Sequence, residues 1–193
     1  MSGRLIMIAA PSGCGKTTIA KAILAKHPEL LFSVSATTRP KRAIEVEGKD
    51  HFFLSKEKFQ EYLHHGDLAE WEEIYGNYYG TLKSEINRAL LQDQSMLFDI
   101  DVKGALSIRK HFPDESILIF IQPPGFEILK HRLESRNTEN PEALKHRLAR
   151  VPMEMEQGLQ FDFQVVNDDL QTAINEVNEI VQKKIKNTIK PHS

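Results

Sequence analysis

The chain has 193 residues, a length at which one compact domain with at most small inserted subdomains is expected. Hydrophobic residues make up 40% and charged residues 27%, an ordinary globular mixture that excludes a disordered chain, a collagen or a coiled-coil rod. With 25 basic and 27 acidic residues the formal net charge is −2, whereas nonspecific binders of nucleic acid or membranes are usually clearly basic.

The predicted elements alternate along the chain. In order they are a strand at 5–9, a helix at 17–26, a short strand at 32–34, helices at 55–64 and 82–91, a strand at 95–101, a helix at 103–111, a strand at 116–121, helices at 126–133 and 141–158, a strand at 163–166 and a helix at 170–185. Strands that alternate with helices predict an α/β fold, with a parallel sheet covered by helices on both faces. Residues 35–81 interleave polar residues, glycines and aromatics, which predicts an inserted subdomain.

Cysteine usage and the N-terminal apolar run bear on the compartment. Cys14 is the single cysteine, so an internal disulfide is excluded, and no Cys/His cluster has the spacing of zinc ligands. The apolar run at 5–10 is too short to cross a membrane and lacks the pattern of a secretory leader. We therefore expect a cytoplasmic protein with no nucleic-acid, membrane or obligate protein partner.

The strongest local signal is a phosphate-binding loop. Residues 10–17 read Ala-Pro-Ser-Gly-Cys-Gly-Lys-Thr, between a predicted strand and a predicted helix. Gly13 and Gly15 let the backbone turn its N–H groups inward, and the helix N-terminus adds partial positive charge. Lys16 can reach the β- and γ-phosphates of a nucleotide, and the Thr17 hydroxyl can ligate Mg²⁺. The alternative is a glycine-rich turn with an incidental lysine.

The inserted segment carries candidates for a second phosphate site. Arg39 and Arg42 lie three apart in a proline-containing loop, and two guanidinium forks can clamp a phosphate. Tyr78 and Tyr79 offer ring faces for stacking and phenol donors. Taken alone, the two arginines are more simply a solvated basic surface.

The same segment carries candidates for base recognition. Glu70 is a two-oxygen acceptor that matches the N1–H and N2–H₂ donors of guanine, a pair that adenine lacks. Ser35 and Thr81 are short hydroxyl side chains that could serve the O6 and N7 side of the base. The alternatives are an ordinary surface glutamate and capping hydroxyls.

Two acids follow an apolar strand, at the place where open α/β sheets bind their ligands. Asp99 and Asp101 end the predicted strand at 95–101, and ligands bind beyond the carboxyl ends of such strands. One of the two could hold Mg²⁺ through water, as the acidic residue of P-loop enzymes does. The alternative is that they begin the following turn.

Arginines flank a polar loop near the C-terminal third of the chain. Arg132 and Arg136 are four apart, so they share a helix face if the helix continues that far, and Arg147 follows the loop. Arginines on a mobile loop can close over transferring phosphates and exclude water. Singly, each is more simply a surface charge.

Together these stretches resemble the guanylate kinase family over nearly the whole chain. The resemblance rests on the loop at 10–17, Ser-Ala-Thr-Thr-Arg-Pro-Lys-Arg at 35–42, Glu-Trp at 70–71, Gly-Asn-Tyr-Tyr-Gly at 76–80, Asp-Ile-Asp at 99–101 and the arginine-bearing segment. It implies a P-loop NTPase-type fold and transfer of the γ-phosphoryl of Mg·ATP to GMP or dGMP, giving ADP and GDP. It also implies a core at 1–34, 82–124 and 159–193, a GMP-binding subdomain at 35–81 and a mobile lid at 125–158.

The resemblance implies roles for individual residues. ATP would be bound by Ala10, Pro11, Ser12, Gly13, Cys14, Gly15, Lys16, Thr17, Thr18 and Asn167. GMP would be bound by Ser35, Arg39, Arg42, His51, Glu70, Tyr79, Thr81 and Asp101. Catalysis would use Lys16, Arg39, Arg132, Arg136 and Arg147, and Mg²⁺ would be held by Thr17 and, through water, Asp99.

The chain departs from the family pattern at four positions, and two other functions remain open. His51 stands where the family usually has Tyr, Ala10 where it has Gly, Thr81 where Ser is common and Asn137 where the lid often has Gly. Because the charge of histidine varies near neutral pH, we expect GMP binding to depend more on pH than with Tyr. One alternative is a kinase of another small phosphate, such as ribose bisphosphate. The other is a related peptide-binding module without catalysis.

Overall fold

Residues 3–74, 76–135 and 141–186 are described by the structure, a computed structural model. Within them, a central sheet holds five strands in the order β2-β7-β1-β8-β9, and all neighbours are parallel. The strands are β1 (Leu5–Ala9), β2 (Leu31–Phe32), β7 (Met96–Asp99), β8 (Ser116–Gln122) and β9 (Phe163–Val166). The predicted α/β fold with a parallel sheet is therefore confirmed.

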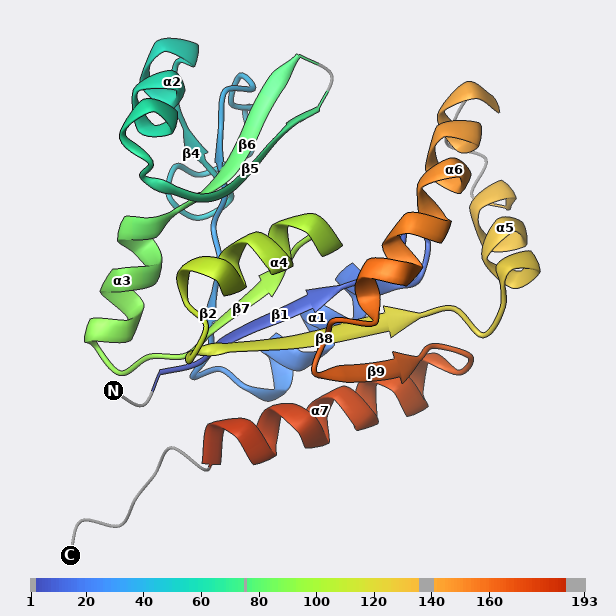
Figure 1. The fold of residues 1–193 in the computed structure, drawn as a ribbon. Helices are drawn as coiled ribbons and strands as arrows, with labels where there is room; N and C mark the ends of the chain where they lie inside the picture. Colours follow the sequence, from blue (N-terminus) through green and yellow to red (C-terminus); the bar gives the residue numbers. More distant parts are fainter. Residues whose placement is uncertain (1–2, 75, 136–140, 187–193) are drawn as a thin grey trace, which may run out of the picture.

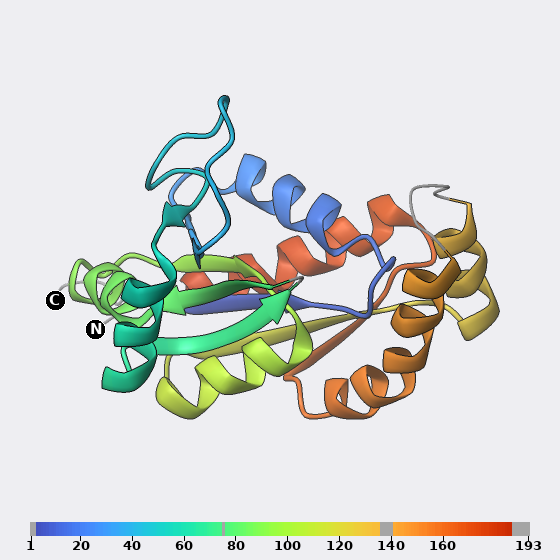
Figure 2. The same ribbon diagram turned by 90° about the horizontal axis from the view of Figure 1, so that it is seen from above.

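Helices cover both faces of this sheet (Figures 1 and 2). They are α1 (Lys16–Lys26) and α7 (Leu170–Lys186) on one face, and α3 (Lys83–Leu91) and α4 (Val102–His111) on the other. Ile6 and Ile8 of β1 pack in the first apolar cluster, whereas Leu5 and Met7 pack in the second. An unbroken apolar strand is what burial on both faces requires.

The residues inserted after β2 form a second, four-stranded sheet with its own small core. Its order is β4-β3-β6-β5, and its elements are β3 (Ala36–Thr37), β4 (Phe52–Phe53), α2 (Lys56–His65), β5 (Leu68–Ile74) and β6 (Asn77–Leu82). Ala36, Phe59, Leu68 and Leu82 are buried in this core. The Ser107 hydroxyl of α4 donates to the backbone carbonyl of Ala69 at 2.8 Å, which links this sheet to the central domain.

Two further helices lie beyond the carboxyl end of the central sheet (Figure 1). They are α5 (Phe126–Glu134) and α6 (Pro141–Gly158). Leu129 and Leu133 of α5 and Val151 of α6 are buried in the same apolar cluster as α1, so both helices are packed against the central domain. At the end of α6, a Cβ on Gly158 would lie 2.5 Å from the ring of Phe120, which fixes the close approach of this helix end to β8.

Most predicted boundaries lie within two residues of the observed ones, and the difference at 95–101 has a clear cause. The strand ends at Asp99 because Asp101 caps α4, its Oδ1 accepting a hydrogen bond from the Gly104 N–H at 2.6 Å. The short strand predicted at 32–34 lies at Leu31–Phe32. In the described part of the chain, no helix combines the length and the hydropathy that a membrane crossing needs.

Candidate active site

The loop between β1 and α1 has the backbone that a phosphate cradle needs. Gly13 and Gly15 adopt φ values of 91° and 79°, in the left-handed region that favours glycine. Gly15 is the N-cap of α1, so the helix begins at Lys16 and its first N–H groups face the loop. The Cys14 N–H donates to the Pro11 carbonyl at 3.2 Å, which closes the turn.

Both glycines also sit against neighbouring side chains. A Cβ on Gly13 would lie 2.8 Å from Cδ2 of Leu133, and a Cβ on Gly15 would lie 2.6 Å from Nδ2 of Asn167. That Asn167 amide donates to the Cys14 carbonyl at 2.8 Å. Asn167, which the family resemblance assigns to ATP binding, is buried behind the loop and supports its backbone.

Lys16 is held at the carboxyl end of β7. Its Nζ donates to the Ile100 carbonyl at 2.9 Å and lies 2.9 Å from Asp99 Oδ1. Within the described residues, that buried Asp99 oxygen makes no hydrogen bond of acceptable geometry, so the contact is an ion pair that leaves lone pairs available. The strand end therefore places an ammonium and a carboxylate beside the loop.

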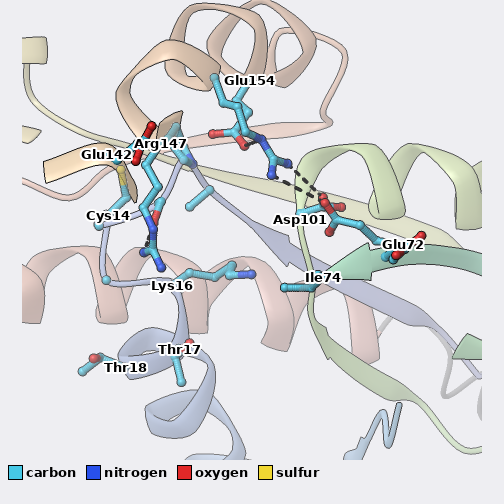
Figure 3. A pocket seen from close by; sticks show the side chains of 17 residues that line it. Cys14, Lys16, Thr17, Thr18, Glu72, Ile74, Asp101, Glu142, Arg147 and Glu154 are labelled. Atoms are coloured by element: carbon cyan, nitrogen blue, oxygen red, sulfur yellow. Dashed lines mark hydrogen bonds and ion pairs between the residues drawn. The ribbon is translucent and has the colours of Figure 1, made fainter. Parts of the chain in front are cut away.

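A cavity of about 880 Å³ opens over the loop (Figure 3). Eleven predicted residues line it, namely Ala10, Pro11, Ser12, Gly13, Cys14, Gly15, Lys16, Thr17, Thr18, Asp101 and Arg147. Arg147 reaches across from α6, its Nη1 donating to the Ser12 hydroxyl at 2.8 Å. Six lining residues were not predicted, namely Glu72, Glu73, Ile74, Glu142, Arg150 and Glu154.

The other predicted arginines are placed differently. Arg132 of α5 is not among the residues that line the cavity, and its guanidinium donates to the carbonyls of Asn167 and Asp168 at 2.8 and 3.3 Å. It therefore ties α5 to the segment after β9. Arg136 and Asn137 lie outside the described residues.

The two faces of the β5–β6 hairpin differ, since one carries carboxyl and hydroxyl side chains and the other carries aromatic rings together with Glu73. Glu70 pairs with Thr81 and Glu72 with Tyr79 across the two strands, so these four side chains share one face. On the opposite face Tyr78 contacts Trp71 and stacks on Phe59 of α2, with ring centroids 6.0 and 5.4 Å apart. The aromatic face thus anchors the hairpin and leaves the polar face available for a ligand.

Glu70 is the most strongly perturbed carboxyl group on this face. The Thr81 hydroxyl donates to its Oε1 at 2.6 Å. Burial raises the pKa of Glu70 to about 7, and the charges of Asp101 and Glu72 add to the rise while the Thr81 hydrogen bond opposes it. A carboxyl group with a pKa near neutrality, beside a second carboxylate, is typical of a binding or catalytic site.

Arg39 and Arg42, the arginines predicted to clamp a phosphate, lie in the segment that follows β3. The Arg39 guanidinium donates to both carboxylate oxygens of Glu45, which raises the pKa of Arg39 and lowers that of Glu45 to about 2. Tyr79 also raises the pKa of Arg39. His51 lies between Ser35 and Tyr79, with Nδ1 3.3 Å from the Ser35 carbonyl and its ring centroid 6.2 Å from that of Tyr79.

The predicted residues thus form two groups. The loop, Lys16 and Arg147 surround the cavity, whereas Arg39, Arg42, His51 and Tyr79 belong to the inserted sheet. Asp101 and Glu72 connect the groups, since both line the cavity and both raise the pKa of Glu70. Of the two acids on β5 that were not predicted, Glu72 lies two residues after Glu70, a spacing that puts both side chains on one face if the segment is a strand, whereas no such signal marks Glu73.

The oxygen ligands available beside the loop suit magnesium. The described residues contain no group of three or more His, Cys, Asp or Glu side chains placed to hold a metal ion. Magnesium does not need such a group, because it binds one or two protein oxygens and completes its shell with water and phosphate oxygens. The Thr17 hydroxyl, exposed at the start of α1, and the Asp99 carboxylate are oxygen donors of this kind.

Comparisons with known proteins all point to one family. The family model described as guanylate kinase matches residues 2–184. The chain is 43% identical to a guanylate kinase of Symbiobacterium thermophilum, over 97% of this chain and 89% of that protein. It is 48% identical to a guanylate kinase of Salinibacter ruber, over 89% of this chain and 92% of that protein. The crystal structure of guanylate kinase from Anaplasma phagocytophilum superposes with a TM-score of 0.72 at 27% identity, covering 98% of this chain and 88% of that one.

Proposed function

The chain belongs to the guanylate kinase family, and on that premise we propose that it transfers the γ-phosphoryl group of ATP to GMP and dGMP, giving ADP together with GDP or dGDP. The observation that carries this proposal is the phosphate loop with both inner glycines in place, Lys16 anchored at the end of β7 and Arg147 reaching Ser12 from α6. A binding module without catalysis has no need of this charged arrangement.

Recognition of the base rests on the polar face of the β5–β6 hairpin. When ionised, Glu70 accepts hydrogen bonds from N1–H and one N2–H of guanine, and Thr81 orients that carboxylate. Ser35 and Asp101 complete the base site. Sugar phosphates offer no such edge, which disfavours the alternative of a ribose bisphosphate kinase.

Arg39, Arg42, His51 and Tyr79 bind the phosphate of GMP. Arg39 and Arg42 provide the charge, and the pair formed by Arg39 and Glu45 fixes the direction of the guanidinium. His51 replaces the tyrosine of the family and supplies a ring N–H instead of a phenol O–H. The phosphate is then directed from the inserted sheet toward the cavity over the loop.

The transfer step needs positioning and charge neutralisation more than acid–base chemistry. An oxygen of the GMP phosphate is already anionic at neutral pH, so it attacks the γ-phosphorus without a strong general base. Lys16, Arg147 and Arg136 stabilise the charge that develops on the transferring group. Arg132 joins them once its guanidinium leaves the carbonyls of Asn167 and Asp168 as the lid closes. Magnesium bound with ATP, held by Thr17 and through water by Asp99, would supply further neutralisation of the phosphate charge.

The proposed domain roles follow the same division. The segments 1–34, 82–124 and 159–193 form the core, 35–81 binds GMP, and 125–158 acts as a lid that excludes water on closing. Water must be excluded because an open site would transfer the γ-phosphoryl to water. We assign this activity to the cytoplasm, and require no protein partner for it.

A coupled ADP-release assay tests the proposed function. Wild type and Lys16→Ala are compared with Mg·ATP and GMP, dGMP, AMP, CMP, UMP or ribose 1,5-bisphosphate. We expect turnover with GMP and dGMP only, lost in the variant and dependent on added magnesium. Binding of GMP without turnover of any acceptor would support the binding module. Turnover of the sugar phosphate would contradict the assignment of the inserted sheet.

A further inference from the structure

Arg150 of α6 contacts three carboxylates that come from three different elements. Its guanidinium nitrogens lie 3.5 Å from Glu72 Oε1 of β5, 3.5 Å from Asp101 Oδ2 at the start of α4, and 3.4 Å from Glu154 Oε1 of α6 itself. Figure 3 shows Glu72, Asp101 and Glu154 on the same side of the cavity, away from Thr18. One side chain of the lid therefore bridges the inserted sheet and the core.

These contacts orient their partners more than they stabilise the fold. They are longer than a strong N–H···O bond, and the Arg150 side chain is 47% exposed, so solvent screens them. Asp101 has one oxygen already fixed, since Oδ1 accepts from the Gly104 N–H at 2.6 Å. Arg150 approaches the other oxygen, so the Asp101 carboxylate is directed from two sides.

The surroundings of Arg150 are strongly acidic. Burial raises the pKa of both Glu70 and Glu154, the charges of Asp101 and Glu72 add to the rise, and Arg150 lowers the pKa of Glu154. Oε2 of Glu154 is buried and has no hydrogen-bond partner among the described residues. Without Arg150, the Asp101 carboxylate would face Glu72 and Glu154 with no guanidinium between them, and repulsion would turn it away.

The 2-amino group of guanine has a second N–H donor from which the Asp101 carboxylate can accept a hydrogen bond. The two oxygens of Glu70 take N1–H and one hydrogen of the 2-amino group, which leaves the second amino hydrogen without an acceptor. Asp101 is the neighbouring acid, since it interacts with Glu70 and caps α4 beside it. Hypoxanthine, the base of IMP, keeps N1–H but lacks the amino group.

We propose that Arg150 is a positioning residue that holds Asp101 toward the 2-amino group of guanine and thereby sets the preference for GMP over IMP. The inference rests on the proposed function, because it assumes that guanine binds at Glu70. It also places part of base recognition on the lid helix, so that the correct base favours the closed lid.

The test compares Arg150→Met, which keeps the aliphatic stem, with Arg150→Lys, which restores a cation. Lys145→Met is the matched control, an exposed lysine of the same helix. Binding constants for GMP and IMP are measured by calorimetry, and kcat and KM for both by ADP release. We expect Arg150→Met to weaken GMP binding about tenfold, through KM, and IMP binding hardly at all. Lysine should restore most of the preference, and Lys145→Met should keep all of it.

A double-mutant cycle separates positioning from a general effect on folding. Asp101→Asn should reduce the preference for GMP by itself, and adding Arg150→Met should then change it little. Equal weakening of GMP and IMP in Arg150→Met, or an unchanged preference, would overturn the inference while the kinase activity stood. If wild type binds GMP no better than IMP or AMP, the proposed function and the inference both fail. Thermal unfolding of each variant identifies any loss of fold.

Discussion

Glu45 holds Arg39 by two parallel hydrogen bonds, with Oε1 accepting from Nη2 at 2.7 Å and Oε2 from Nη1 at 2.9 Å. The same Oε2 accepts the backbone N–H of Arg42 at 2.7 Å. One carboxylate therefore fixes the guanidinium of Arg39 and the main chain of Arg42, the two arginines proposed to bind the GMP phosphate. The sequence predicted a phosphate clamp made of two arginines, and in the structure Glu45 connects them.

Glu45→Gln should weaken GMP binding. The glutamine amide has one acceptor oxygen and no charge, so it holds the Arg39 guanidinium less firmly than Glu45 does. Ordering that guanidinium then costs free energy when the phosphate of GMP binds. We expect KM for GMP to rise roughly three- to tenfold, with little change in kcat. Asp50→Asn is the control, since Asp50 accepts from the Val46 N–H in the same loop and contacts neither arginine. A lower KM in Glu45→Gln would instead show that Glu45 competes with the phosphate.

GMP affinity should rise with pH through the titration of Glu70. The pKa of Glu70 is raised to about 7 without ligand, and the guanine donors bind only the ionised form. GMP must then lower the pKa of Glu70, and binding releases a proton below pH 7. Calorimetry between pH 5.5 and 8.5 should show affinity that rises and then levels off above pH 7. Because the phosphate of GMP also titrates, the same series is run on Glu70→Gln, and identical profiles would contradict this assignment.

The free energy of unfolding should also depend on pH through the titration of Glu70. The folded-state pKa of Glu70 lies above the unfolded value near 4.5, so ionisation costs stability as pH rises from 4.5 through about 7. Glu70→Gln removes this cost and keeps an acceptor for Thr81. We expect the variant to match wild type near pH 4 and to gain at most about 3 kcal/mol at pH 8, by urea unfolding. Equal stability at pH 8 would mean that water reaches the carboxylate.

Lys16→Ala should lower kcat far more than it changes stability. The Lys16 ammonium lies between the Ile100 carbonyl and Asp99, beside the phosphate loop. From there it can stabilise the negative charge that develops on the transferring phosphoryl group. Loss of one such donor costs on the order of 10²- to 10³-fold in kcat. Lys21→Ala, on the exposed side of the same helix, serves as the control. A variant that retains more than a tenth of kcat would contradict the role of Lys16.

Gly15→Ala should destabilise the loop for two separable reasons. Gly15 has a φ of 79°, and its new methyl group would lie 2.6 Å from the Asn167 amide. We expect a loss of about 2–4 kcal/mol in the free energy of unfolding, with weaker ATP binding. Combining it with Asn167→Ala removes the clash and leaves the strained φ, so the double variant should lose less than the sum of the two single losses. Additive losses would show that the contact is unimportant.

The sequence was sufficient for the elements whose pattern is set by burial. The strand predicted at 5–9 is β1, because an unbroken apolar run between turns has few other solutions. The strand predicted at 163–166 is β9, a short run in which Gln164 is the single polar residue. The β5–β6 hairpin was not predicted. Its polar face carries Glu70, Glu72 and Tyr79, and Glu73 follows Glu72, so three acids within four residues mask the apolar and polar alternation that marks a strand.

Site residues divide in the same way. The loop at 10–17 has a sequence signature because its backbone geometry demands particular residues. Arg150 and Glu154 have none, since an arginine and a glutamate four apart on a helix are ordinary surface charges until the fold brings Asp101 and Glu72 beside them. The place of Asn167 behind the loop likewise depends on β9 lying next to β8.

The inserted segment leaves the core and returns to it side by side. Ala36 pairs with Gly80 and Thr37 with Tyr79, so the two connections to the core are neighbouring strands, about 5 Å apart. Whatever lies between them can be lengthened, shortened or replaced while the core keeps its connectivity. The inserted segment is thus a structural unit that can be exchanged without rearranging the core. Specificity for a new phosphoryl acceptor can evolve, or be grafted, within one contiguous stretch of sequence. The phosphate loop and the central sheet that carries it stay unchanged.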